Sequence, residues 1–322
     1  MDPDHSRPVT VSAKGSLHPD ETKLLVLDIG VASPVDPMHS GTVLELSADG
    51  KSKKVLVTGQ RLPDGIDLDA VSGRMFWTCM GVPGKDDGEV FSANLDGSDV
   101  RSIVSQGIVN TPKQLTVEPT TRKLYFCDRE GMSVLRCNYD GSDLEVLVQN
   151  GDWKAEGVAD CCKWCVGITV APRLNRFYWT QKGPSKAGRG RIFSARIDGP
   201  ATRDRTDIEL ILDHLPEPID LEIDEGSEML YWTDRGELPY GNSVNCAQLN
   251  AVTGLAVPAD DGKPFHILSR HYNEAIGIKL NLEAGCMYVT DLSGTVYRCS
   301  LDGSSKERIL SDDDCAFTGI TA

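Results

Sequence analysis

The stretch Leu230-Tyr231-Trp232-Thr233-Asp234 decides the fold, because weaker copies of it return about every fifty residues along the chain. The last positions of these copies fall at residues 28, 79, 128, 181, 234 and 291, which gives intervals of 51, 49, 53, 53 and 57 residues. A repeat of this length is typical of solenoids, propellers and other arrays of one supersecondary unit. The sequence therefore predicts six copies of a single unit.

Each copy is one of four short apolar runs, which follow one another in the same order in every unit. In the second copy the runs cover residues 65–69, 75–78, 89–95 and 101–104, and Asp96-Gly97 between the last two is a hairpin turn signal. The runs are rich in Val, Ile, Tyr and Trp and are bounded by Gly, Asp and Pro, which favours strands over helices. We therefore expect an all-β protein, a six-bladed β-propeller with four-stranded antiparallel blades and very little helix.

The unit boundaries predict one domain over residues 1–322, with blades at about 20–60, 61–106, 107–150, 160–213, 214–269 and 270–311. The first unit lacks a well-placed inner strand. Phe317-Thr318-Gly319-Ile320-Thr321 matches the inner-strand sequence Gly167-Ile168-Thr169, so residues 317–321 are expected to complete the first blade. Residues 9–13 compete for that place. Closing the ring with the C-terminal strand would remove an exposed sheet edge.

Composition limits the partners. The 322 residues include 33 basic and 48 acidic side chains, for a net charge of −15, and the basic residues are not clustered. A phosphate-backbone binder needs such clusters, so nucleic acid and anionic membrane surfaces are not expected as partners. No apolar run reaches the ~18 residues of a membrane span. Residues 1–20 lack the basic and apolar regions of a secretory signal, and we expect a cytoplasmic location.

Ten cysteines raise the question of disulfides. A reducing cytosol favours free thiols. Cys127 and Cys137 fall on neighbouring strands of one predicted hairpin, and Cys286 and Cys299 fall on those of another, so bridges within these pairs remain an open alternative.

The sequence offers little support for a metal site or a cofactor. Cys161-Cys162-Lys163-Trp164-Cys165 is the one cluster of possible ligands, but a structural zinc site needs four ligands, usually as two pairs, and no second CxxC or HxxxH is present. The six histidines have no ligand spacing, and Walker A, HExxH, GxSxG and dinucleotide-binding motifs are missing. We expect no bound metal and no cofactor.

The repeats resemble the YWTD repeats, class B, of low-density lipoprotein receptors. The residues that carry the resemblance are Tyr231-Trp232-Thr233-Asp234, Phe76-Trp77-Thr78, Tyr178-Trp179-Thr180, Tyr288-Val289-Thr290-Asp291 and the Leu-Asp-Gly turns at 95–97 and 301–303. The similarity extends over all six copies. Cys79 and Gln181 replace the aspartate in the second and fourth copies, so these blades are expected to lack the usual turn bonding. The repeated residues are mainly structural, and a common fold does not define an activity.

We expect the functional site where the loops that enter the inner strands meet the loops that follow the YWTD strands. Both sets project to one face of the ring, around the mouth of the central channel. Four of the second set are long, at residues 29–40, 80–88, 182–190 and 235–242. The candidate catalytic residues are Asp64, Lys113, Arg129, Glu217, Arg235 and Glu274, and the candidate substrate-binding residues are Met38, Gln114, Trp153, Trp164, Tyr240 and Asn273. This mixture suits a flat, partly apolar organic molecule.

In its length and architecture the chain also resembles the stand-alone fungal propellers that act as hetero-Diels–Alderases in tropolonic sesquiterpenoid biosynthesis. The resemblance implies small-molecule partners: a polyketide-derived quinone methide, formed by loss of water, and a humulene-type terpene. Such a coupling requires a near-attack pose and hydrogen-bond donors rather than a nucleophile.

The same resemblance implies a role for each candidate. The terpene pocket would be shaped by Met38, Trp153, Trp164 and Tyr240. The tropolone oxygens would accept hydrogen bonds from Lys113, Arg129 or Arg235. The acid–base groups for the dehydration would be Asp64, Glu217 or Glu274.

Two other function classes stay open. A protein-binding scaffold would use an exposed face, as receptor propellers do. A metal-dependent, lactonase-like hydrolase would place Asp64, Glu217, Asn273 and Glu274 around a divalent cation in the channel.

Overall fold

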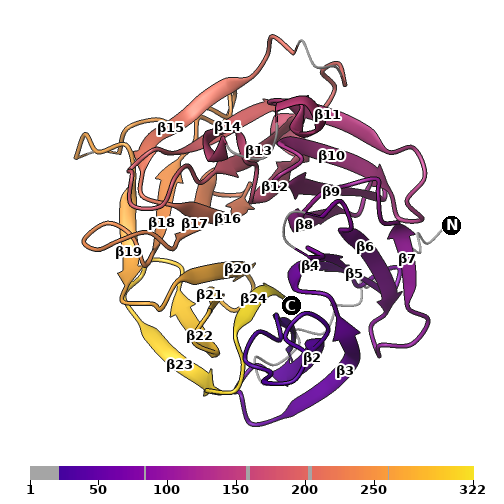
Figure 1. Ribbon diagram of the computed structural model, residues 1–322. Coiled ribbons are helices and arrows are strands. Elements are labelled where there is room, and N and C mark those ends of the chain that lie inside the picture. The colour runs from indigo at the N-terminus through magenta and orange to yellow at the C-terminus, as the bar shows by residue number, and fades with distance from the viewer. Residues whose placement is uncertain (1–21, 83–84, 157–159, 202–204, 260) are drawn as a thin grey trace, which may run out of the picture.

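The computed structural model describes residues 22–82, 85–156, 160–201, 205–259 and 261–322. These residues form six four-stranded antiparallel sheets arranged as blades around a central axis (Figure 1). The predicted six-bladed all-β propeller is therefore confirmed. The competing strand at residues 9–13 lies outside the described residues.

The strands of each blade are given from the inner to the outer edge, and blade 1 contains β24 (Phe317–Thr321), β1 (Lys23–Asp28), β2 (Gly41–Ser47) and β3 (Lys53–Gln60). Blade 2 contains β4 (Pro63–Asp69), β5 (Arg74–Cys79), β6 (Glu89–Asn94) and β7 (Arg101–Val104). Blade 3 contains β8 (Pro112–Glu118), β9 (Lys123–Asp128), β10 (Ser133–Asn138) and β11 (Glu145–Gln149). Blade 4 contains β12 (Ile168–Ala171), β13 (Arg176–Gln181), β14 (Gly190–Arg196) and β15 (Glu209–Leu215). Blade 5 contains β16 (Pro218–Asp224), β17 (Met229–Asp234), β18 (Ser243–Gln248) and β19 (His266–Arg270). Blade 6 contains β20 (Ala275–Asn281), β21 (Cys286–Asp291), β22 (Thr295–Ser300) and β23 (Lys306–Ser311). The helical segments of the described residues are α1 (Trp153–Glu156) and two 3-10 turns, η2 (Cys161–Lys163) and η3 (Pro172–Leu174).

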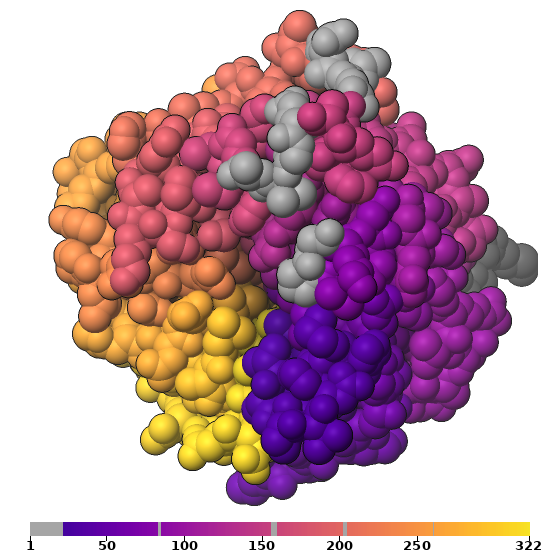
Figure 2. Space-filling model, in the orientation of Figure 1, coloured from indigo at the N-terminus to yellow at the C-terminus, as the bar shows by residue number. Residues whose placement is uncertain are grey.

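The C-terminal strand closes the ring. β24 pairs antiparallel with β1, with Leu25 opposite Thr321 and Asp28 opposite Phe317. The first blade is thus built from both ends of the described chain, and the yellow surface of blade 6 adjoins the indigo surface of blade 1 in Figure 2. The sequence prediction for residues 317–321 is confirmed.

Each inner strand bulges at the same place. In blade 2, residues 64 and 65 together face Thr78, because Pro63 pairs with Cys79 and Ile66 pairs with Trp77. The same two-for-one register recurs at residues 113–114, 219–220, 276–277 and 318–319. In blade 4 the amide of Val166 and the carbonyl of Gly167 both pair with Thr180, which continues the pattern. A bulge of this kind re-aims side chains, here near the channel mouth.

The threonine of the YWTD pattern joins neighbouring blades. The Thr78 hydroxyl accepts the Gly65 amide at 3.0 Å and donates to the Lys113 carbonyl of the next blade at 2.7 Å. Corresponding bridges are formed by Thr180, Thr233 and Thr290. In blade 4 the bulge residue is Gly167, and a Cβ there would lie 1.9 Å from the Ile219 carbonyl oxygen, whereas in blade 5 Asp220 occupies the same position. The repeated threonine is therefore structural.

The aspartate at the end of the pattern ties two loops together. Asp128 accepts the amides of Asn110 and Thr111, in the loop before β8, and that of Gly131, in the loop after β9. At the two positions where the aspartate is replaced, Cys79 contacts Gln60 and Gln181 accepts from Arg191. These blades thus use other contacts, as the sequence indicated.

The core lies between the blades. Trp77, Trp179 and Trp232 of the YWTD strands are almost completely buried. Aromatic side chains of this size bury about 150–250 Å² each and dominate the apolar contribution to stability. All ten cysteines are free, seven of them buried. No helix in the described part of the chain is long and apolar enough to cross a membrane.

Candidate functional site

The first residues of the six bulges form a ring at the channel mouth. They are Asp64, Lys113, Val166, Ile219, Ile276 and Thr318. Val166, Ile219 and Ile276 pack together as an apolar cluster. The only two charged members come from neighbouring blades 2 and 3, so one side of an otherwise uncharged ring carries a charged pair.

Lys113 and Asp64 form a buried ion pair, with the Lys113 Nζ donating to the Asp64 Oδ1. Gln114 donates to the Asp64 Oδ2 at 3.0 Å, and the Lys113 Nζ also lies 3.1 Å from the Met80 sulfur. Burial lowers the pKa of Lys113; Asp64 opposes this effect, while Arg129 and Arg235 add to it. Lys113 therefore loses its proton more readily than a lysine with an ordinary pKa.

A cavity of about 240 Å³ opens above this pair. Its lining residues are Ile29, Leu62, Asp64, Met80, Gly81, Thr111, Lys113, Arg129, Arg235, Ile276, Leu292 and Thr318. A cavity of about 150 Å³ holds benzene, whereas drug-sized ligands occupy roughly 300–1,000 Å³. The central cavity thus suits one substituted ring, with an apolar wall and four charged groups.

Two arginines reach this cavity from the loops that follow β9 and β17. Arg129 forms a two-point contact with Glu130, and its guanidinium lies 5.1 Å from the centroid of the Trp164 ring. Arg235 lies 3.2 Å from Glu217 through Nε and 3.4 Å from Glu274 through Nη1. Because a guanidinium has five N–H donors, these contacts leave donors on both arginines for a ligand.

Glu217 is a buried anion. It lies 3.4 Å from the Lys182 Nζ and also accepts from Arg235 and Ser185. Burial alone would raise the pKa of Glu217, but Lys182 and Arg235 hold it below the usual value. At neutral pH this side chain is therefore a carboxylate, which can accept a proton but cannot donate one.

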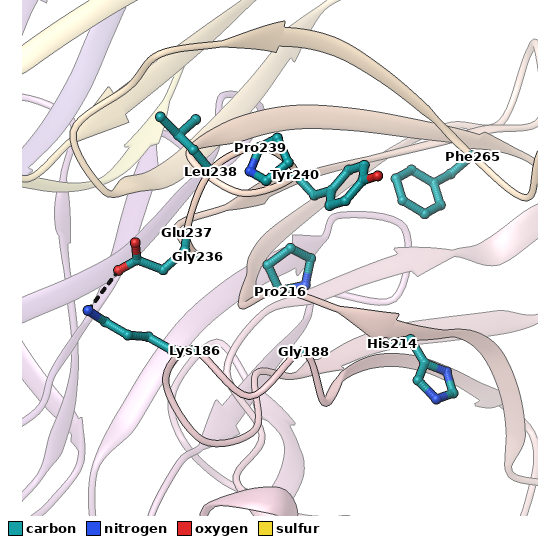
Figure 3. Close-up of a pocket in the computed structure, with 10 residues that line it drawn as sticks. All are labelled: Lys186, Gly188, His214, Pro216, Gly236, Glu237, Leu238, Pro239, Tyr240 and Phe265. Carbon is teal, nitrogen blue, oxygen red and sulfur yellow. Dashed lines mark ion pairs between the residues drawn. The ribbon is translucent and has the colours of Figure 1, made fainter.

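A second cavity, of about 360 Å³, lies between blades 4 and 5. Figure 3 shows the rings of Tyr240 and Phe265 side by side above Pro216, with the ion pair of Lys186 and Glu237, 3.1 Å long, at the rim. Gly236 lines this cavity, and the preceding Arg235 lines the central one. Consecutive residues of one loop therefore border the two cavities.

The structure separates the predicted site residues into three groups. The central cavity is lined by Asp64, Lys113, Arg129 and Arg235, with Gln114, Trp164, Glu217 and Glu274 in contact with these four. Tyr240 belongs to the outer cavity. Met38, Trp153 and Asn273 line neither of these cavities: Met38 is half-buried in the loop after β1, Trp153 packs under Lys154, and Asn273 is exposed and bonded to Ser293.

The proposed metal ligands do not converge. Asp64 pairs with Lys113, Glu217 with Lys182 and Arg235, and Glu274 with Arg235. Among the described residues, no three His, Cys, Asp or Glu side chains are grouped so as to hold a metal ion. The arrangement of these carboxylates fits organic recognition better than metal binding.

Sequence reasoning missed Met80, Ile276 and Phe265. Met80 directly follows β5, and Ile276 is the first bulge residue of β20. Both positions recur in the other blades, so an alignment of the six repeats could have identified these two residues. Phe265 directly precedes β19, the outer strand of blade 5, and no local pattern connects it with the loop that carries Tyr240.

Fold and site together define a six-bladed propeller of the YWTD class with a polar cavity at its channel mouth. No family model matches the chain. It is 41% identical over 324 residues to the 3-hydroxyacyl-CoA dehydrogenase-like protein LAM1 of Cochliobolus heterostrophus, covering 96% of this chain and 68% of that protein. It is 43% identical over 296 residues to a low-density lipoprotein receptor-related protein 1 of Pyricularia oryzae, covering 90% of this chain and 94% of that protein.

The chain therefore belongs to the family of these two fungal proteins. Among solved structures, a chain of the nidogen/laminin complex matches with a TM-score of 0.67 and 17% identity, covering 92% of this chain and 97% of that one. At this identity the match supports the propeller fold alone.

Proposed function

We propose that the chain is an enzyme of fungal secondary metabolism that binds an oxygen-bearing ring compound in the central cavity. Its proposed reaction is the hetero-Diels–Alder coupling of a tropolone-type quinone methide with a humulene-type terpene. The observation that carries the proposal is the pair of Asp64 and Lys113, which places a buried cation beside an apolar wall at the channel mouth. Preorganised donors of this kind stabilise oxygen atoms on which charge develops.

In this proposal the tropolone ring occupies the central cavity. Its oxygens accept hydrogen bonds from Lys113, Arg129 and Arg235, while Ile276 and Leu292 contact the ring. The size of the cavity, about 240 Å³, matches one substituted ring and leaves no room for a sesquiterpene beside it.

The outer cavity supplies the remaining space. Its lining by Leu238, Tyr240 and Phe265 is mostly apolar, and its volume of about 360 Å³ suits a hydrocarbon partner. Arg235 and Gly236 border the two cavities, so the proposed coupling requires the reacting ends of both molecules to meet beside this loop. Holding two reactants at bonding distance would contribute to catalysis by proximity.

The dehydration step requires an acid and a base. Asp64, whose carboxylate lines the cavity beside Lys113, is the proposed base. The ammonium form of Lys113 is the proposed acid, because its pKa lies below the usual lysine value and it therefore releases a proton more readily. Asp64 orients the amine through its hydrogen bond.

The relatives suggest two other functions. The receptor-related name of the Pyricularia protein favours a protein-binding scaffold as the second candidate. The name of LAM1 suggests a dehydrogenase. Dinucleotides are usually bound by a parallel sheet with crossover helices, and the described residues contain antiparallel blades and a single four-residue helix. We therefore do not extend that chemistry to this chain.

The test is to incubate the purified chain with the quinone-methide precursor and humulenol, and to measure product formation and stereochemistry. We expect one stereoisomer at a rate above background. Lys113→Met should lower that rate by roughly 10²–10³, as loss of one oxyanion donor does, while Lys23→Met at the exposed start of β1 should not change it. Background rate and background stereochemistry with the wild-type chain would refute the proposal, and a stable protein partner in pull-downs would then favour the scaffold.

A further inference from the structure

Three lysines of the described chain lie in the interior of the ring, and they differ in their surroundings. The Lys279 Nζ lies 2.8 Å from Asp67 and 3.0 Å from Glu222, and these two carboxylates raise its pKa against the effect of burial. Lys182 lies 3.4 Å from Glu217. Lys113 alone lines the central cavity.

We propose that Lys113 is a nucleophilic amine that forms an imine with an aldehyde or ketone held in the central cavity. Its Nζ lies between the Asp64 carboxylate and the Met80 sulfur, at the wall of a cavity large enough for one ring. The proposal rests on the proposed function only in that a small molecule enters the mouth. It does not depend on the cycloaddition.

An amine must be neutral to attack a carbonyl carbon. Lysines become nucleophilic when they are desolvated or placed beside other cations. Both conditions hold here, because burial and the charges of Arg129 and Arg235 lower the pKa of Lys113. Asp64 favours the charged form of Lys113. Its carboxylate is nevertheless in direct contact with the Lys113 Nζ, so it can take the proton that the ammonium releases.

The reaction balances without any oxidant or reductant. The Lys113 ammonium first passes one proton to Asp64. The neutral nitrogen then bonds to the carbonyl carbon as the C=O π bond breaks, and one of its two protons passes to the carbonyl oxygen to give a carbinolamine. Asp64 donates its proton to the departing hydroxyl, which leaves as water, and the regenerated carboxylate takes the last N–H proton to give the neutral imine. One carbonyl compound and one amine thus yield one imine and one water.

The same geometry indicates the ligand class. Arg129 and Arg235 line the cavity together with Lys113, and guanidinium groups favour planar oxyanions. The ligand is therefore an aldehyde or ketone on a single ring that also carries an acidic group, such as a carboxylate or an enolic oxygen. A compound of this class would be fixed at one end by the arginines and captured at the other by the amine.

The experiment uses 4-formylbenzoate as the probe, at pH 7, with sodium cyanoborohydride to reduce any imine to a stable secondary amine. Tandem mass spectrometry then locates the modified lysines. We expect Lys113 to be modified faster than exposed Lys23, because a lowered pKa raises the neutral fraction of the Lys113 amine and the arginines hold the probe beside it. Lys279, whose carboxylate partners hold it charged, should remain unmodified and serves as the internal reference.

Three comparisons complete the test. Lys113→Arg keeps the positive charge but cannot form an imine, so the site-specific label should disappear while labelling of Lys23 persists. Benzaldehyde, which lacks the carboxylate, should label Lys113 more slowly than 4-formylbenzoate. If Lys113→Arg fails to fold, the wild-type map still decides. Modification of Lys23 with Lys113 unmodified would overturn the proposal, and this result is independent of whether any terpene coupling occurs.

Discussion

The backbone amide of Gln114 donates directly to the Val166 carbonyl at 3.1 Å, and this bond joins blades 3 and 4 without a side-chain hydroxyl between them. At four other junctions, a threonine hydroxyl stands between the bulge amide and the carbonyl of the next blade. In blade 3, Cys127 replaces the threonine of the YWTD pattern, and its thiol lies 3.2 Å from the Gly167 carbonyl oxygen. A direct backbone bond therefore replaces the threonine bridge at this junction.

This difference predicts unequal effects of substitution. Thr233→Val removes a hydroxyl that bridges the Asp220 amide and the Ile276 carbonyl, both buried. Leaving such groups unpaired costs about 1–3 kcal/mol. Cys127→Thr should change stability by less than about 1 kcal/mol, because the amide there already has a backbone partner. Urea unfolding measures both, with Thr42→Val within β2 as the control. Equal losses at both positions would contradict the account.

The channel also contains a charge cluster whose cation should be essential for stability. Lys279→Met would leave Asp67 and Glu222 facing each other without their shared cation. Breaking a buried pair costs roughly 3–5 kcal/mol, and we expect about 2–3 kcal/mol because part of the lysine side chain remains exposed to the channel. The exposed pair of Lys23 and Glu45 is the matched control, and Lys23→Met should cost less than about 1 kcal/mol. Similar free energies of unfolding for the two variants would show that the cluster is solvated.

Asp234 should make stability depend on pH. Burial raises the pKa of Asp234 to about 7, while the amides of Glu217 and Gly236 act against this shift. The folded protein therefore retains a proton that the unfolded chain releases near pH 4, and the contribution to stability falls as the pH rises from about 4 to about 7. Asp234→Asn removes the titration but keeps an oxygen acceptor. Its stability relative to wild type should increase between pH 5 and pH 8 in chemical unfolding, whereas a constant difference would show that the two amides keep the carboxylate ionised.

The thiols should be mostly unreactive in the native state. Burial raises the pKa of Cys79 and Cys137 to about 12, whereas Cys161, Cys162 and Cys315 are partly exposed. We expect at most three thiols to react with Ellman's reagent in the folded protein and ten after denaturation without reductant. A smaller total in denaturant would reveal disulfides.

The fold could be predicted from the sequence because the pattern is local and repeated. The YWTD copies set the number of blades, and the likeness of Phe317-Thr318-Gly319 to an inner strand identified the closing strand. Both features depend on residues close together in the chain, so neighbouring positions alone were enough to predict them.

The site could be predicted only in part. The face and the group around Lys113 and Arg235 followed from the loop positions. The partition into two cavities could not be predicted, because Tyr240 and Phe265 line one cavity only through the paths of two loops, which no short pattern determines. Trp164 was expected against a terpene, yet it stacks under Arg129, since a guanidinium from the neighbouring loop reaches its ring.

The most direct test of the central claim is calorimetric titration of the wild-type chain and of Lys113→Met with tropolone, with Lys23→Met as the control. We expect one binding site in the wild type and in the control. Binding to Lys113→Met should be about 10–100-fold weaker, because a hydrogen bond to a charged group contributes roughly 1.5–3 kcal/mol. No binding to the wild type, or equal affinity in all three proteins, would contradict the assignment of the central cavity as the ligand site.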